Sequence, residues 1–193
     1  MACCYKCGAE LRFALVFLML TITGIGTVCF HGALQRWMQI LDEVPMLWLI
    51  VAVIFCVYER NVAAHGGRQY GLWLPLVLVA WATVVSCVAV LVHGPMQVAC
   101  FQSSFACALL VALYGIYKQY CETTDQTTLN IARGSAAMMA VGVLCWSADG
   151  LLCSYLQNLP YGLPNPQLHA WGWHLGSALG CYGNTMDALS SDR

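Results

Sequence analysis

The sequence predicts an all-α, multi-pass membrane protein whose transmembrane helices number about six. Charged residues make up only 9% of the chain, with eight Lys and Arg against nine Asp and Glu in 193 residues, whereas an ordinary soluble domain carries about 25%. Hydrophobic residues make up 60%, and the mean hydropathy is +0.68. Such a chain has too few polar groups to cover a water-facing surface, and it is too apolar for a disordered protein. A soluble enzyme is therefore excluded.

Charge and length narrow the class further. The formal net charge of −1 argues against a nucleic-acid partner, because such a partner requires a basic face. A spanning helix uses about 20 apolar residues, so six spans and their connections take up the whole length. We therefore expect residues 1–193 to form a single transmembrane domain, with no separate soluble domain.

Six apolar segments follow one another along the chain. They are residues 11–31, 45–58, 71–93, 95–117, 131–156 and 166–186. The second is short and is expected to recruit Ile40 and Leu41, and the sixth is interrupted by Gly, Trp and His. Helices are predicted because a backbone in lipid must satisfy its own hydrogen bonds, and the continuous runs lack the alternation of barrel strands. Small residues in the fifth segment predict a helix-contact face; they are Gly134, Ala137 and Gly142.

The basic residues are distributed unevenly between the two membrane faces. With six spans, seven of the eight fall on the side of the termini, and only Arg36 falls on the other. The seven are Lys6, Arg12, Arg60, Arg68, Lys118, Arg133 and Arg193. Basic residues prefer the cytoplasmic side, so we expect both termini in the cytoplasm. The connections at 32–44, at 94 and at 157–165 should then face the lumen or exterior.

Most of the twelve cysteines lie scattered in apolar runs, where cysteine behaves as a small hydrophobe. The exceptions are Cys3, Cys4 and Cys7 near the N-terminus. A reduced or palmitoylated tail at the membrane is favoured. A zinc site is the alternative, and it would need a second cysteine pair.

Ionisable residues inside a membrane are costly, and they indicate function. His31 ends the first segment, Asp42 and Glu43 precede the second, and His169 and His174 open the sixth. In the six-span order, these helix ends all meet the non-cytoplasmic face.

Three histidines with one open position form the ligand set of a catalytic zinc, which lowers the pKa of a bound water to about 7. Asp42 could hold that water and take its proton. Thr27 lies four residues before His31 on the same helical face, and its hydroxyl could stabilise an oxyanion or orient the water.

Structural readings compete with these functional ones. His65 and His93 are interpreted as interfacial anchors, and for His31 and the later pair both readings remain open. Asp42 and Glu43 also suit a helix N-terminus, where the helix dipole favours carboxylates. Asp149, in the stretch WSAD, is expected to pair with a Tyr or Trp of a neighbouring helix.

Three stretches resemble signatures of the alkaline ceramidases. TGIGTVCFHGALQRWMQILDEVPMLW (23–48) resembles that family's G-x-G-S-x-x-F-H element followed by Q-x-L-D-E-L-P-M. WSADGLLC (146–153) resembles its W-x-x-D-x-x-x-C, and LHAWGWH (168–174) resembles its final H-A-W-W-H. The elements occur in family order over nearly the whole chain, and the segments between them match only in hydropathy.

The resemblance implies a zinc-dependent membrane hydrolase of the ceramide amide bond, which yields a sphingoid base and a fatty acid. Carried over onto this sequence, the zinc ligands are His31, His169 and His174. The Asp that holds the water is Asp42, and Thr27 occupies the position of the family's Ser. Zinc is the implied cofactor, and ceramide in the bilayer is the implied partner, with no obligate protein partner.

Two departures from the family concern the site. Thr27 keeps the hydroxyl of Ser but adds a methyl group and stiffens χ1, so rate or substrate range should change. His169 and His174 are five residues apart, and on a regular α-helix a step of five turns about 140° past a full circle. Either a one-residue π-bulge at Gly172 realigns the two rings, or the zinc site is broken.

A third departure concerns the start of the chain. The family has seven spans and an acidic, calcium-binding N-terminal segment, whereas only MACCYKCGAEL precedes the first apolar run here. The first helix and the calcium site are therefore expected to be absent, so that the chain is a truncated form, a fragment or a reduced variant. Cys153 matches the family cysteine that pairs with a Cys in that segment, and here it is expected to lack that partner.

We therefore expect a zinc-dependent ceramide amidohydrolase in the endoplasmic reticulum or Golgi membrane. A catalytically degenerate, receptor-like or scaffold member of the same fold is the first alternative, and the His169 to His174 spacing favours it. A hydrolase of another membrane lipid is the second, although the LDEVPM match favours ceramide.

Overall fold

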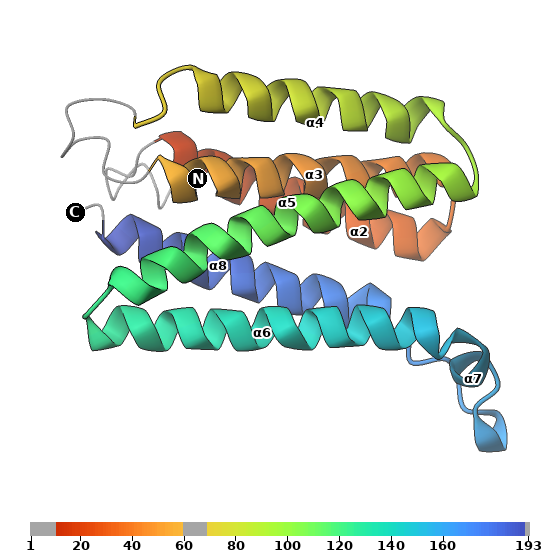
Figure 1. Cartoon of the computed structure of the whole chain (residues 1–193). Coiled ribbons are helices and arrows are strands. Elements are labelled where there is room, and N and C mark those ends of the chain that lie inside the picture. The colour runs from red at the N-terminus through yellow and green to blue at the C-terminus, as the bar shows by residue number, and fades with distance from the viewer. Residues whose placement is uncertain (1–10, 60–68, 192–193) are drawn as a thin grey trace. The chain divides into compact units, whose positions relative to one another are not determined.

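The computed structural model describes residues 11–59 and 69–191, with side chains up to residue 186, and every regular element in these ranges is helical (Figure 1). The long helices are α2 (Leu11–Ala33), α3 (Arg36–Tyr58), α4 (Trp73–Leu91), α5 (Pro95–Glu122), α6 (Gln126–Leu151) and α8 (His174–Ser191). Three short elements follow α6, namely α7 (Cys153–Gln157), η1 (Pro160–Gly162) and η2 (His169–Trp173). The all-α fold class is confirmed. Several residues named above lie outside the described ranges: Cys3, Cys4, Lys6, Cys7, Arg60, His65, Arg68 and Arg193.

Five of these helices are long and apolar enough to cross a bilayer. They are α2, α3, α4, α5 and α6, with mean hydropathies between 1.3 and 2.5 in their best windows. Long apolar side chains on several of them are exposed, including Leu76, Val84, Leu110 and Leu144. Outward-facing apolar side chains of this kind suit lipid rather than water. The chain is therefore a multi-pass membrane protein.

The sixth apolar segment forms two helices end to end, η2 and α8, and it is not among the five. Its Gly, Trp, His, Ser and Asn residues lower its hydropathy, as its interrupted sequence indicated. The fifth segment was expected to run to residue 156, but α6 ends at Leu151 and α7 begins at Cys153.

The connection expected over residues 32–44 was wrong. Only Leu34 and Gln35 separate α2 from α3, and Leu34 adopts a positive φ of 52° that reverses the chain. As a result, Asp42 and Glu43 lie in the second turn of α3, and the first turn of α3 contains no acidic residue. The interpretation of these two carboxylates as helix N-terminal residues is therefore wrong.

The chain forms two compact units. The first comprises α2 to α5 together with residues from Thr185 onward, and the second comprises Asp125–Asn184. In the first unit, α3 packs against α2, α4 and α5. Its core includes two clusters of buried side chains, Ile50, Ile54, Ala108 and Ala112 in one and Leu47, Val85 and Phe101 in the other.

In the second unit, α6 packs closely against η2 and α8 through small residues. A Cβ atom added to Gly176 would lie 2.7 Å from the Met138 carbonyl oxygen, and one added to Gly142 would lie 3.2 Å from the Trp173 carbonyl oxygen. Gly142 is thus confirmed as a contact residue. Gly134, in contrast, has open space around it and Ala137 is exposed, so their predicted place in this face was wrong. The residues of α6 in this contact follow the predicted ones by one position, since they include Ser135 and Met138.

Candidate functional site

Thr27 and Asp42 form a buried hydrogen bond between α2 and α3. The Thr27 hydroxyl donates to Asp42 Oδ1 over 2.5 Å, and it also lies 2.9 Å from the Thr23 carbonyl oxygen. Asp42 is 4% exposed and Thr27 is 8% exposed. A single hydroxyl proton can serve only one of these acceptors at a time. The Thr27 hydroxyl therefore joins α2 to the Asp42 carboxylate of α3.

The close approach of α2 and α3 at this point depends on Gly26 and Pro45. Pro45 lies inside α3 and has no N–H, so the Leu41 carbonyl loses its usual helical donor. A Cβ atom on Gly26 would lie 2.0 Å from that carbonyl oxygen. Only glycine can occupy this position without displacing one helix from the other. The pair Gly26 and Pro45 thus sets the spacing across which Thr27 reaches Asp42.

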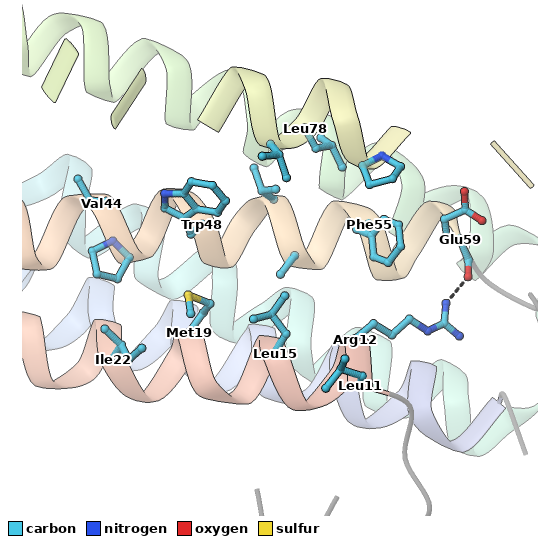
Figure 2. A pocket seen from close by; sticks show the side chains of 15 residues that line it. Leu11, Arg12, Leu15, Met19, Ile22, Val44, Trp48, Phe55, Glu59 and Leu78 are labelled. Atoms are coloured by element: carbon cyan, nitrogen blue, oxygen red, sulfur yellow. Dashed lines mark hydrogen bonds between the residues drawn. The ribbon is translucent and has the colours of Figure 1, made fainter. Parts of the chain in front are cut away.

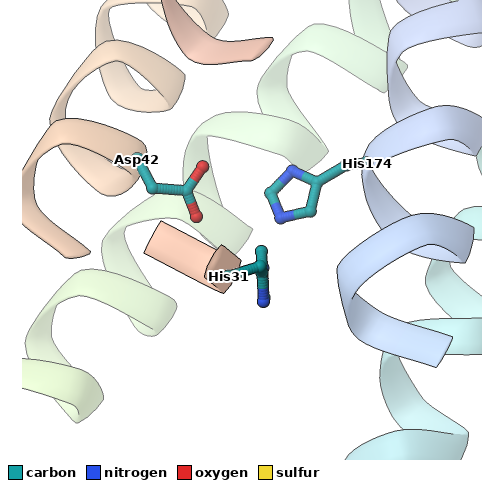
Figure 3. Close-up of side chains that lie close together, drawn as sticks. All are labelled: His31, Asp42 and His174. Carbon is teal, nitrogen blue, oxygen red and sulfur yellow. The ribbon is translucent and has the colours of Figure 1, made fainter. Parts of the chain in front are cut away.

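His31 lies one turn after Thr27 on α2 and faces the same carboxylate. A ring nitrogen of His31 and a carboxylate oxygen of Asp42 lie within 4.8 Å of each other (Figure 3). The structure therefore brings together three residues predicted for the site: Thr27, His31 and Asp42.

The predicted π-bulge is confirmed. Residues His169–Trp173 form the π-helix η2, which leads directly into α8. The imidazole rings of His169 and His174 are stacked, with 5.5 Å between centroids and 16° between planes. Residues five apart on a π-helix lie on the same side of the helix, whereas on a regular α-helix these two rings would point in different directions.

Gly172 permits this local geometry by packing directly on α6. It is buried, and a Cβ atom there would lie 2.6 Å from both Cβ and Sγ of Cys145. Beside it, the Trp173 ring lies 6.1 Å from the Trp146 ring. The glycine identified in the sequence as the inserted residue therefore has a packing role as well.

Other residues considered from the sequence lie outside this arrangement. Asp149 lies in α6, and its expected pairing with a Tyr or Trp of a neighbouring helix stays a prediction. Cys153 is a free thiol on the surface, 3.2 Å from the Gln157 amide nitrogen. His93 is exposed, and its Nδ1 lies 3.0 Å from the Leu91 carbonyl oxygen, as suits an anchor near a helix end.

One of the two amide partners of Glu43 was not expected from the sequence. This partner is Gln97 in the first turn of α5, which is 2% exposed and donates to Glu43 Oε2 over 2.5 Å. The sequence did contain a signal for it, because Gln97 places an amide side chain near the start of the apolar run 95–117.

An apolar cavity of about 820 Å³ lies along α2, α3 and the start of α4 (Figure 2). Apart from Arg12 and Glu59 at one end, its lining is apolar; it includes Leu15, Met19, Ile22, Trp48, Phe55 and Leu78. The Arg12 guanidinium donates to the Glu59 carbonyl oxygen, and the Glu59 carboxylate accepts the backbone N–H groups of Gln69 and Tyr70 over 2.8 and 3.0 Å.

This cavity is separate from the Thr27–Asp42 pair. Leu15 and Ile22 lie about 120–140° round α2 from Thr27, so they face a different side of the helix. A volume this apolar suits an alkyl chain rather than a polar ligand.

The helices and these side chains define a multi-pass membrane protein with histidines and a carboxylate held inside its apolar segments. A family model described as Ceramidase matches residues 1–188. The chain therefore belongs to the ceramidase family.

Known relatives agree with this assignment. The chain is 27% identical over 174 residues to an alkaline ceramidase of Arabidopsis thaliana, a match covering 90% of this chain and 63% of the relative. It is 27% identical over 186 residues to alkaline ceramidase 3 of Mus musculus, covering 93% and 66%. An alkaline ceramidase of Drosophila melanogaster is 25% identical over 170 residues, covering 86% and 56%. The chain thus spans just under two thirds of the length of the first two relatives, and less of the third.

Proposed function

We propose that this chain is a zinc-dependent amidohydrolase that cleaves the ceramide amide bond to a sphingoid base and a fatty acid. The observation that carries the proposal is the buried Thr27–Asp42 hydrogen bond with His31 beside it, inside apolar helices. Relatives named alkaline ceramidases support ceramide as the substrate class.

The donor set fits zinc. We assign His31, His169 and His174 as the residues that would hold it, because three imidazoles are a ligand set of catalytic zinc. The rings of His169 and His174 are stacked 5.5 Å apart, centroid to centroid, so η2 brings two of these donors side by side. When bound, zinc would polarise the amide carbonyl and acidify a coordinated water.

The chain's own residues would then act on the substrate and the water. Asp42 accepts the proton of the attacking water and passes it to the leaving amine. Thr27 donates to Asp42 Oδ1 and so fixes the rotation of the carboxylate. The apolar surroundings exclude bulk water, which strengthens each of these polar contacts.

Topology supports a common membrane face for these groups. His31 lies at the end of α2, whereas His169 and His174 follow α6, so four candidate spans separate the two sets. An even number of crossings returns the chain to the face it left. The five-residue histidine spacing, which favoured a receptor-like or scaffold member, is accommodated by η2.

We further propose that residues 1–193 work as one domain in the endoplasmic reticulum or Golgi membrane, with both termini cytoplasmic. The partner is a bilayer lipid that can present its amide bond while its alkyl chains stay in apolar surroundings.

The test combines zinc content and turnover in purified protein. Wild-type protein in detergent or nanodiscs should contain about one zinc per chain and hydrolyse ceramide. His31→Ala should lose zinc and activity together, and Asp42→Ala should lose at least 10²-fold in kcat, as expected for loss of a general base.

His93→Ala is the matched control, because His93 is an exposed histidine outside the assigned ligand set. It should retain both zinc and turnover. Wild-type protein free of zinc, or turnover untouched by the His31 and Asp42 substitutions, would contradict the proposed function.

A further inference from the structure

Three side chains from α3 and α5 form a closed hydrogen-bonded triangle, which we name the clasp: Gln39, Glu43 and Gln97. Gln39 Nε2 donates to Glu43 Oε1 over 2.7 Å, and Gln97 Nε2 donates to Glu43 Oε2 over 2.5 Å. Gln39 Nε2 also lies 3.5 Å from Gln97 Oε1. Each oxygen of Glu43 therefore has an amide donor, and the clasp joins the second turn of α3 to the first turn of α5.

The clasp lies directly next to the proposed catalytic carboxylate. Glu43 follows Asp42 in sequence, so the two side chains leave α3 about 100° apart. Asp42 is held by Thr27 of α2, and Glu43 is held by Gln97 of α5. Two neighbouring helices thus restrain α3 at consecutive residues.

Rotation of α3 is the motion that these restraints prevent. A side-chain atom lies 5–6 Å from the helix axis, so a 20° rotation would move it by about 2 Å. The Thr27–Asp42 contact of 2.5 Å would not survive such a shift. One turn before Gln39, Arg36 donates to the Val92 carbonyl oxygen over 2.7 Å, which ties the start of α3 to the connection before α5.

We propose that Gln39, Glu43 and Gln97 are positioning residues that set the rotation of α3 and thereby aim Asp42 at the reacting water. The inference rests on the proposed function of Asp42. Amide donors hold Glu43 at both of its carboxylate oxygens, as suits a residue that positions its neighbour. Its role is carried through the backbone to its neighbour.

The first test compares two hydrogen bonds between the same helices. Gln97→Ala opens the clasp, whereas Gln119→Ala removes a bond to the Val57 carbonyl oxygen at the other end of the α3–α5 contact. A misplacement of about 1 Å can cost 10²-fold in rate. We therefore expect Gln97→Ala to lower kcat by 10- to 100-fold with KM within about twofold, and Gln119→Ala to stay within about twofold in both. Equal effects of the two variants would overturn the inference.

The second test exchanges the two groups. The double variant Glu43→Gln with Gln97→Glu puts the carboxylate on α5 and the amide on α3, and the amide groups can rotate to restore the hydrogen bonds. If Glu43 only positions Asp42, the exchange should recover kcat to within about threefold of wild type. An exchanged protein that melts like wild type yet stays as slow as Gln97→Ala would assign Glu43 a direct chemical role and overturn the inference.

A third measurement separates this inference from the proposed function. The clasp restrains α3, which carries Asp42 but none of the three assigned zinc ligands. Gln97→Ala should therefore keep the wild-type zinc content while its kcat falls. Wild-type protein that holds zinc but leaves ceramide intact would contradict the proposed function, whereas a loss of zinc from Gln97→Ala as large as that from His31→Ala would contradict the positioning role of the clasp.

Discussion

At the scale of single residues, the Thr27 hydroxyl is the group whose loss should be easiest to interpret. Thr27→Val keeps the branched shape but removes the donor to Asp42 Oδ1. The buried carboxylate then loses a charge-assisted hydrogen bond, worth about 1.5–3 kcal/mol. We expect kcat/KM for ceramide to fall by about 10²-fold, with the loss in kcat, measured under single-turnover and steady-state conditions.

Thr27→Ser is the matched control, because it keeps the hydroxyl and removes only the methyl group. Its kcat/KM should stay within about tenfold of wild type, in either direction. Serine is less restricted at χ1, which weakens the positioning of the hydroxyl, but it also crowds the site less. If the Val and Ser variants lose activity equally, the methyl group rather than the hydroxyl matters, and the proposed role of Thr27 is wrong.

At the scale of helices, Gly26 allows the backbones of α2 and α3 to approach each other closely. Gly26→Ala would place a methyl group 2.0 Å from the Leu41 carbonyl oxygen, and backbone on both sides leaves no flexible group to give way. Overpacking of this kind typically costs 1–3 kcal/mol. We expect a lower thermal midpoint in detergent and a loss of turnover, because separating the helices breaks the Thr27–Asp42 bond.

Gly24→Ala tests the same chemistry two residues away. A Cβ atom there meets nothing within 4 Å, and alanine favours a helix over glycine by about 1 kcal/mol. This variant should melt at or above the wild-type temperature and keep its activity. A Gly26→Ala protein as stable and active as Gly24→Ala would show that the close contact does not position the site.

The π-helix η2 gives a second prediction at this scale. Gly172→Ala would place Cβ 2.6 Å from Cβ and Sγ of Cys145, so η2 must shift away from α6 and take His169 with it. We expect zinc content after dialysis to fall and the thermal midpoint to drop. The double variant with Cys145→Gly vacates that space, so it should recover zinc content even though a helical glycine costs about 1 kcal/mol. No recovery would indicate that the glycine is needed for the backbone itself rather than for contact with α6.

These elements also show what the sequence could and could not predict. The π-helix was one of the two outcomes that the spacing left open, because five residues misalign two ligands on any regular α-helix, so that either a bulge realigns them or the site is broken. The stretch 36–44 was misread as a connection because it is polar. In the fold, the polar side chains of Gln39 and Glu43 form hydrogen bonds with each other and with Gln97 of α5. Local hydropathy gives no information about such a partner from another helix. The contact of Gly26 with Leu41 depends likewise on the packing of two helices, so no local pattern around either residue indicates it.

At the scale of the whole molecule, the charge distribution and the number of spans make one joint prediction. Seven of eight basic residues fall on the predicted cytoplasmic side only if α2 to α6 each cross the membrane and a sixth crossing follows. Five helices meet the criteria of length and hydropathy, and η2 with α8 must supply the sixth. The polarity of that segment is no obstacle, because its small and polar residues pack on α6 through Gly142, Gly176 and Gly180 rather than on lipid.

Glycosylation acceptors can locate each connection in microsomes. An Asn-Gly-Thr insertion after Pro164 should be glycosylated, because residues 158–168 are predicted to follow an odd number of crossings and to face the lumen. The same insertion after Thr123, between α5 and α6, should remain unmodified, as should one appended after Arg193. Modification after Arg193 in addition to that after Pro164 would mean that α8 does not cross, yet His169 and His174 would still share a face with His31. Modification after Thr123 instead of after Pro164 would mean that the helices cross the membrane in the opposite direction. The two sets of histidines would then lie on the cytoplasmic face, and the cytoplasmic assignment of the basic residues would be wrong.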